Sequence, residues 1–235
     1  MTQIKNSELM SILMRCALGL MLMASMALSA QDWPELNRYK KQNEQLGEPR
    51  EGERRIVFMG NSIIEGWKSS DPEFFATPGF VNRGIGGQTT PQMLLRFRQD
   101  VIDLKPEIVV ILAGTNDIAG NTGPMTLEEI RDNLISMSEL SHANGIRVIL
   151  CSVLPAHEYV WRPGLEPNVK IPRLNSLLKE YAQRSGDYYL DFFKTMADER
   201  NGLPEDYAHD GVHPTRKGYD VMKTLLLNAL SEMAE

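Results

Sequence analysis

The chain has 235 residues, of which 42% are hydrophobic and 24% charged, and its formal net charge is −6. This composition fits one globular domain of ordinary size. The acidic balance, without any run of basic residues, excludes nucleic acid and anionic lipid as expected partners.

Residues 1–30 differ from the rest of the chain. Two basic residues precede an apolar run at 16–28, and the small residues Ser29 and Ala30 follow it. This order is typical of a cleaved secretory signal peptide, so we expect an exported protein, periplasmic or extracellular, in which 31–235 form a single domain. The apolar run is shorter than the ~20 residues of a membrane-spanning helix. We therefore expect no membrane span after cleavage, and an uncleaved anchor is the alternative.

The predicted elements begin with a short helix in the polar stretch 31–50, where Trp33, Leu36 and Tyr39 lie at helical spacing. From there the pattern becomes strand, turn and helix, repeated. The unbroken apolar run at 55–60 is typical of a strand buried on both faces of a parallel sheet. A weaker strand at 79–82 leads into a glycine-rich loop, and the helix after that loop starts with a proline and stops before Pro106.

The second half of the chain repeats this pattern. An apolar strand at 108–113 precedes a helix that begins at the capping box Thr126-Leu127-Glu128-Glu129. The remaining predicted elements are a strand at 147–154, a long loop at 155–172, a helix at about 174–184, a strand at 188–191 and a last helix from about 215. Strands that alternate with helices predict an α/β fold, here a flavodoxin-like three-layer α/β/α arrangement with a five-stranded parallel sheet.

Residues with catalytic chemistry follow the ends of several predicted strands. Ser62 follows the first strand, the glycine pair 86–87 the second and Asn116 the third, while Asp210 and His213 follow the fifth. Ligands of such sheets bind at the carboxyl ends of the strands. We therefore expect these residues to share one edge of the sheet.

Their chemistry is that of a serine nucleophile. A serine hydroxyl needs a base within hydrogen-bond reach, and His213 suits this role. Asp210, three residues earlier, can fix the histidine tautomer. The developing oxyanion needs donors, which the backbone N–H of Ser62, a glycine N–H from 86–87 and the Asn116 amide can supply.

Four blocks of the sequence resemble those of the SGNH, or GDSL, hydrolase family, and their spacing is most similar to esterases like platelet-activating-factor acetylhydrolase. The blocks are Gly60-Asn61-Ser62-Ile63, Gly84-Ile85-Gly86-Gly87-Gln88-Thr89-Thr90, Gly114-Thr115-Asn116-Asp117 and Asp210-Gly211-Val212-His213-Pro214. The resemblance covers the chain from about Arg55 to its C-terminus. It implies a catalytic set that needs no cofactor: Ser62, Asp210 and His213, with oxyanion donors from Ser62, Gly87 and Asn116 and with Gly86 as the neighbouring possibility. Asn61 departs from the family, which usually has aspartate there.

We therefore expect a serine esterase that cleaves short-chain esters, of which acetyl esters are favoured, and whose substrate is a small molecule or a carbohydrate. Acyl transfer to a sugar at the same site and a non-catalytic carbohydrate-binding homologue are the alternatives. Within the long loop, Tyr159 and Trp161 are expected to form a flat surface for a sugar ring, and the competing interpretation is that Trp161 only packs the loop.

A metal site is the alternative to the serine mechanism. Asp206, His209, Asp210 and His213 carry side chains of the kinds that bind metals. Such a site leaves Ser62 and Asn116 without a role, so we expect no metal.

Overall fold

The computed structural model describes residue 14 and residues 32–234. The predicted signal peptide, apart from residue 14, lies outside this part of the chain. Within it, no helix is long and apolar enough to cross a membrane.

The centre of the fold is a parallel sheet of five strands, ordered β2-β1-β3-β4-β5. The strands are β1 (Ile56–Gly60), β2 (Phe80–Gly84), β3 (Ile108–Leu112), β4 (Arg147–Cys151) and β5 (Tyr188–Leu190). In the register of the sheet, Gly60 lies beside both Gly84 and Leu112. The first three strands therefore end at one level, and the order reverses at β1, where such sheets place their ligands.

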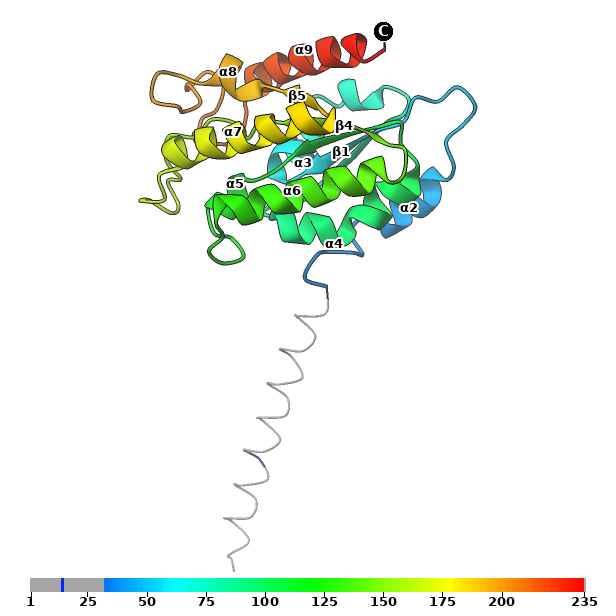
Figure 1. Ribbon diagram of the computed structural model, residues 1–235, viewed down its shortest axis with the longest axis horizontal. Coiled ribbons are helices and arrows are strands. Elements are labelled where there is room, and N and C mark those ends of the chain that lie inside the picture. The colour runs from blue at the N-terminus through cyan, green and yellow to red at the C-terminus, as the bar shows by residue number, and fades with distance from the viewer. Residues whose placement is uncertain (1–13, 15–31, 235) are drawn as a thin grey trace, which may run out of the picture.

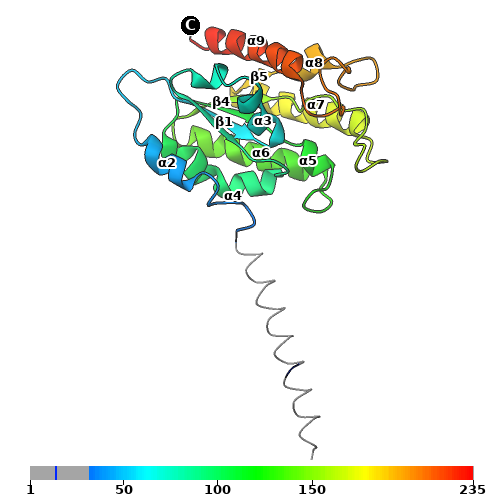
Figure 2. The same ribbon diagram turned by 180° about the vertical axis from the view of Figure 1, so that it is seen from behind.

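Helices cover both faces of the sheet (Figures 1 and 2). On one face lie α3 (Ser62–Ser70), α8 (Phe192–Met196) and α9 (Arg216–Glu232), and on the other α4 (Thr90–Asp100), α6 (Leu127–His142) and α7 (Pro167–Ser185). Alternate residues of β1 enter the two cores: Ile56 and Phe58 face the first set of helices, and Val57 and Met59 the second. The predicted three-layer α/β/α fold is confirmed.

Four shorter helices complete the described elements: α2 (Lys40–Leu46), α5 (Thr115–Ile118) and 3₁₀ turns at Phe74–Ala76 and Ile102–Leu104. The capping box predicted at Thr126 and Glu129 is present at the start of α6. A second capping box joins Thr89 and Gln92 at the start of α4. These side chains satisfy N–H groups that have no partner within the helix, which fixes where each helix begins.

The N-terminal helix lies within the predicted stretch 31–50 but begins after the three spaced side chains. Residues 32–39 form turns, and α2 follows at Lys40–Leu46. The Asp32 carboxylate accepts hydrogen bonds from the backbone N–H groups of Leu36 and Asn37, at 2.6 and 3.2 Å. A local side-chain acceptor of this kind competes with helical hydrogen bonding, so the spacing at 33–39 does not produce a helix.

Two other boundaries differ from the prediction because of side chains distant in sequence. Strand β4 ends at Cys151, since Asn175 exchanges hydrogen bonds with the backbone of Val153 instead of a neighbouring strand. Helix α7 begins well before residue 174 and includes Pro172. Proline frees the carbonyl four residues earlier. That carbonyl, of Asn168, accepts a hydrogen bond from Asn201 Nδ2 at 3.0 Å, so the helix tolerates the proline.

Candidate active site

The candidate nucleophile lies at a tight junction between β1 and α3. A Cβ atom at Gly60 would come within 2.6 Å of Leu112 O, so only glycine fits. Asn61 then caps α3, and its Oδ1 accepts a hydrogen bond from Ile63 N at 3.0 Å. Asparagine thus makes the cap that the family's aspartate would make at this position. Ser62 is the first residue of α3, where backbone N–H groups have no partner within the helix.

Ser62, His213 and Asp210 form one line of hydrogen bonds. Ser62 Oγ lies 2.9 Å from His213 Nε2, and His213 Nδ1 lies 2.6 Å from Asp210 Oδ2. A carboxylate only accepts hydrogen bonds, so Nδ1 carries a proton and Nε2 of the neutral ring accepts from the serine hydroxyl.

Asp210 is held in place by the turn that it starts. Its Oδ1 accepts from the backbone N–H groups of Val212 and His213, at 2.9 and 2.7 Å. Partial burial raises the pKa of Asp210, but hydrogen bonds from the His213 side chain and from these N–H groups lower it more, and the net pKa lies below its ordinary value. The carboxylate therefore stays ionised beside the imidazole.

The two glycines after β2, Gly86 and Gly87, differ in whether the backbone N–H has a hydrogen-bond partner. Gly86 N donates to Glu65 Oε2 at 2.8 Å, and the other Glu65 oxygen lies 2.7 Å from Arg38 Nη2. Gly87 has a positive φ of 76°, which glycine tolerates, and no acceptor for its N–H lies among the described residues. Gly87 is thus the member of the pair with an N–H open to a ligand.

Asn116 contacts the same loop from the end of β3. Its Nδ2 donates to Gln88 O at 2.9 Å, and its side chain is buried. An amide carries two N–H bonds, so the second remains for another acceptor. The predicted oxyanion donor Gly87 therefore lies on a loop that Asn116 contacts from α5. This loop lies beside Ser62, since a Cβ atom at Gly86 would be 3.9 Å from the Cβ of Ser62.

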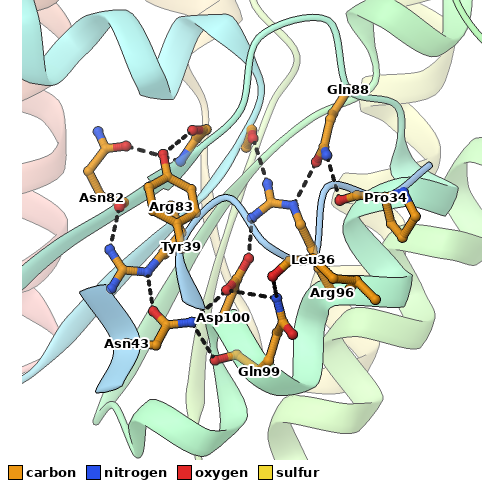
Figure 3. Close-up of polar contacts among 12 residues, drawn as sticks. Pro34, Leu36, Tyr39, Asn43, Asn82, Arg83, Gln88, Arg96, Gln99 and Asp100 are labelled. Atoms are coloured by element: carbon orange, nitrogen blue, oxygen red, sulfur yellow. Dashed lines mark hydrogen bonds and ion pairs between the residues drawn. The ribbon is translucent and has the colours of Figure 1, made fainter. Parts of the chain in front are cut away.

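An arginine that the sequence reasoning missed supports this loop from below (Figure 3). Arg96 is fully buried in α4, and its guanidinium donates to Gln88 Oε1 at 2.6 Å and to Gly60 O at 3.2 Å. Asp100 compensates the charge at 3.0 Å. Arg96 thereby joins the end of β1, just before Ser62, to the glycine-rich loop that contains Gly87 and Gln88. The sequence feature that could have identified Arg96 is its spacing of four residues from Asp100, which allows an ion pair beside the apolar face of α4.

The N-terminal segment lies against α4 and this loop. Three glutamine amides of the loop and α4 bind its backbone carbonyls: Gln88 donates to Pro34 O, Gln92 to Trp33 O and Gln99 to Leu36 O. Figure 3 shows the first and last of these contacts.

Asp117 lies next to Asn116 and is buried. Its Oδ1 accepts from the N–H and the hydroxyl of Thr90, at 2.8 and 2.6 Å, whereas Oδ2 has no partner among the described residues. Burial raises the pKa of Asp117 to about 6, against the lowering effect of the Thr90 hydrogen bonds. Asp117 thus ties the start of α4 to the strand end that carries Asn116.

Of the two aromatic residues expected to bind a sugar, only Trp161 is accessible. Tyr159 is fully buried, and its hydroxyl is hydrogen-bonded to Thr115. Trp161 is 47% exposed and stacks on Tyr159 with 5.3 Å between ring centroids. The expected two-ring surface is therefore one exposed ring supported by a buried one. Its loop lies beside the segment after Asn116, because Arg162 donates to the carbonyl of Gly120 at 2.6 Å.

The residues of the metal alternative do not converge. Asp206 pairs with Lys217, and Asp210 with His213. Nowhere in residues 32–234 do three or more His, Cys, Asp or Glu side chains form a group that could hold a metal ion.

An open groove of about 780 Å³ passes the nucleophile between α2 and α3, and we call it the α2–α3 groove. Its lining includes Ser62, Glu65 and Lys68 on one side, Arg38 and Gln42 on the other, and Arg83 of β2. Strand β2 is the edge strand of the sheet, so the groove runs across the free edge of the sheet to the candidate nucleophile.

Comparison with known proteins gives a match to the model of the GDSL-like lipase/acylhydrolase family over residues 58–221. The chain belongs to this family. A solved GDSL-like lipase from Bacteroides thetaiotaomicron is 45% identical, with a TM-score of 0.83, and the match covers 85% of this chain and 98% of that one. The family match contains all four blocks, which confirms the resemblance drawn from them.

Two curated relatives of this GDSL-like chain have named activities. An acetylxylan esterase from Xylanibacter ruminicola is 23% identical over 77% of this chain and 44% of its own length. The platelet-activating factor acetylhydrolase IB subunit alpha2 from Rattus norvegicus is 27% identical over 53% of this chain and 52% of its own length. The chain spans between a third and about half of the length of the curated relatives that it matches first.

Proposed function

We propose that this chain is a serine esterase that hydrolyses short-chain esters, chiefly acetyl esters, through an acyl-enzyme on Ser62. The observation that carries the proposal is the hydrogen-bonded line from Ser62 Oγ through His213 to Asp210. It lies at the strand ends where this fold binds its ligands, beside two unoccupied N–H donors. Family membership and the named esterase relatives support the reaction class.

In the first half of the reaction, Ser62 Oγ bonds to the ester carbonyl carbon and its proton passes to His213 Nε2. Asp210 holds the imidazolium through Nδ1–H. The carbonyl oxygen becomes an oxyanion and accepts from Ser62 N–H, Gly87 N–H and Asn116 Nδ2. The bond to the leaving oxygen then breaks, and that oxygen takes the proton from Nε2. The alcohol leaves, and the acyl group stays on Ser62.

In the second half, water takes the place of the alcohol. His213 Nε2 removes a proton from the water while its oxygen bonds to the acyl carbon. Collapse of this intermediate breaks the bond to Ser62 Oγ, which regains its proton from Nε2, and the carboxylic acid is released. Gly87 is favoured over Gly86 as a donor because Glu65 already accepts from Gly86 N–H.

The proposed substrate has a short acyl group and a polar leaving group. The groove that reaches Ser62 is open and has polar and charged side chains along both walls, which disfavours a long apolar chain. A sugar ester fits these features, and one relative is named for acetylxylan. The exposed ring of Trp161 is proposed to contact the sugar. We also propose that the protein is exported, on the strength of the leader-like residues 1–30.

The test is turnover of p-nitrophenyl acetate combined with labelling by a fluorophosphonate, which reacts with activated serines. We expect turnover and a single adduct on Ser62, with both lost in Ser62→Ala and turnover reduced about 10⁴-fold or more. Ser136→Ala, a partly exposed serine on α6, is the control and should behave as the unmodified protein. Normal turnover by Ser62→Ala would exclude the serine mechanism. Release of free acetate, and not of an acetylated sugar when sugars are added, separates hydrolysis from acyl transfer.

A further inference from the structure

The α2–α3 groove contains a buried arginine, Arg83, that forms no ion pair with a carboxylate of the described chain. Arg83 is 6% exposed, yet no carboxylate of the described chain lies within ion-pair distance of it. The two other buried arginines are both paired: Arg55 with Glu53 at 2.7 Å, and Arg96 with Asp100 at 3.0 Å. Arg83 is therefore an exception among the buried arginines of this protein.

The neutral partners of Arg83 leave one of its nitrogens available. Nε donates to Asn43 Oδ1 at 2.9 Å and Nη1 to Asn82 O at 2.7 Å, while the Tyr39 ring centre lies 4.7 Å from the guanidinium carbon. No bond of Nη2 to a described residue is present. Nη2 is not among the fully enclosed side-chain atoms that lack a partner, and Arg83 is one of the residues that line the groove.

An unbalanced buried charge is costly to a fold unless something pairs with it. Burial lowers the pKa of Arg83 to about 10, so the guanidinium keeps its charge at neutral pH. Asp100 lies beyond Asn43, whose Nδ2 donates to it, and Asp100 is already paired with Arg96. Asp100 therefore acts on Arg83 only through space, and no carboxylate forms a direct ion pair with this cation at the groove.

Basic residues outnumber acidic ones along the groove. Lys68 of α3 is exposed and forms no ion pair within the described residues. Glu65 is the one acidic residue among those that line the groove, and its carboxylate is engaged by Arg38 and by Gly86 N–H. The groove is therefore positively charged, although the chain as a whole has a net charge of −6.

We propose that the α2–α3 groove binds the leaving group of the ester and that Arg83 and Lys68 recognise a carboxylate on it, as in an acetylated uronic-acid sugar. The proposal rests on the esterase function proposed above, because it places the leaving group beside Ser62. A guanidinium pairs with a carboxylate through short, charge-assisted hydrogen bonds, and the polar neighbours Gln42 and Asn82 suit the hydroxyl groups of a sugar.

The test compares two substrates that differ in one group: acetylated methyl glucuronoside, which has a carboxylate at C6, and acetylated methyl glucoside, which has a hydroxymethyl group there. We expect the unmodified enzyme to favour the uronate by about tenfold in kcat/KM, as one charged hydrogen bond requires. The preference should appear mainly in KM and should shrink in high salt, because ions screen the attraction.

Three variants test which residues cause the preference for the uronate. Arg83→Gln should bring the ratio of the two kcat/KM values close to one, and Lys68→Gln should lower it about threefold, as an exposed charge does. Lys40→Gln removes a charge of the same sign on α2 from a residue that does not line the groove, and should leave the ratio unchanged. If Arg83→Gln does not fold, the result for Lys68→Gln decides whether the groove recognises the carboxylate.

A ratio near one in the unmodified enzyme, with normal turnover of p-nitrophenyl acetate, would overturn the carboxylate site and leave the esterase function standing. If no ester is turned over, the esterase proposal fails. Binding of the two sugars then tests whether the groove recognises a carboxylate. NMR titration of Ser62→Ala with methyl glucuronoside and methyl glucoside should show binding of the glucuronoside alone. Loss of that binding in a double variant that also carries Lys68→Gln or Arg83→Gln supports the site. Equal binding of both sugars, or of neither, overturns it.

Discussion

Glu65 Oε2 accepts a hydrogen bond from Gly86 N at 2.8 Å, and this contact decides which glycine N–H remains open at the candidate active site. Arg38 holds the other oxygen of the same carboxylate. An α3 side chain and the N-terminal segment therefore share control of the loop that follows β2.

Removal of this contact should impair catalysis without abolishing it. In Glu65→Ala, Gly86 N–H is released and the loop loses its anchor, so we expect kcat to fall about 10–100-fold while KM for p-nitrophenyl acetate changes little. Glu180→Ala, which removes a surface Glu–Arg pair on α7, is the matched control. An unchanged kcat in Glu65→Ala would show that the loop keeps its geometry without the carboxylate.

Asn116 provides a second test of the oxyanion site. Asn116→Ala should lower kcat by roughly 10²–10³, the usual effect of losing one oxyanion donor. The same change removes the hydrogen bond to Gln88 O, so thermal unfolding has to be measured alongside the rate. Asn116→Asp keeps the side-chain shape but offers no N–H donor, and should be as slow as Asn116→Ala. Normal turnover by Asn116→Asp would reassign the residue to loop structure.

Asp117 should make stability depend on pH. Its pKa is about 6 in the fold and near 3.8 when exposed, so between these values the folded state binds more protons than the unfolded state. The free energy of unfolding should therefore fall as pH rises from about 4 to about 6, by about 3 kcal/mol in total. Urea unfolding at several pH values should show this slope reduced in Asp117→Asn but retained in Asp103→Asn, an exposed control. Parallel pH profiles for the unmodified protein and Asp117→Asn would contradict the assignment.

Trp161 should matter only for sugar substrates. If its exposed ring contacts the sugar, Trp161→Ala lowers kcat/KM for acetylated xylo-oligosaccharides about tenfold and leaves p-nitrophenyl acetate turnover unchanged. Trp161→Phe, which keeps a flat ring over Tyr159, should retain most of the activity on the sugar. Equal losses on both substrates in Trp161→Ala would indicate that the ring only packs the loop.

Local patterns were sufficient to predict most of the fold. The apolar runs of β1 and β3 and the capping box of α6 depend on neighbouring residues alone, and these elements were predicted in the right place. The end of β4 depends on Asn175 and the inclusion of Pro172 in α7 on Asn201, which act across the fold, and both boundaries were missed. A pattern of residue types carries no information about such contacts.

The candidate site likewise contains residues that the sequence predicted and residues that it did not. The four blocks were enough to select Ser62, Asp210 and His213, which the fold brings within hydrogen-bond distance. The support beneath them was not predicted, because Arg96 and Glu65 look in the sequence like ordinary charged residues of two helices. Their partners lie in other segments, and only the folded chain identifies them.

The glutamine contacts of the N-terminal segment affect how this protein should be produced. Residues close to the start of a chain are commonly trimmed or replaced by a purification tag. Here the carbonyls of Trp33 and Pro34 are bound by Gln92 and Gln88, and Gln88 in turn contacts Asn116. A shortened or tagged form that disturbs residues 33–36 should therefore turn over esters more slowly, so the measured rate would depend on the chosen starting residue as well as on the chemistry at Ser62.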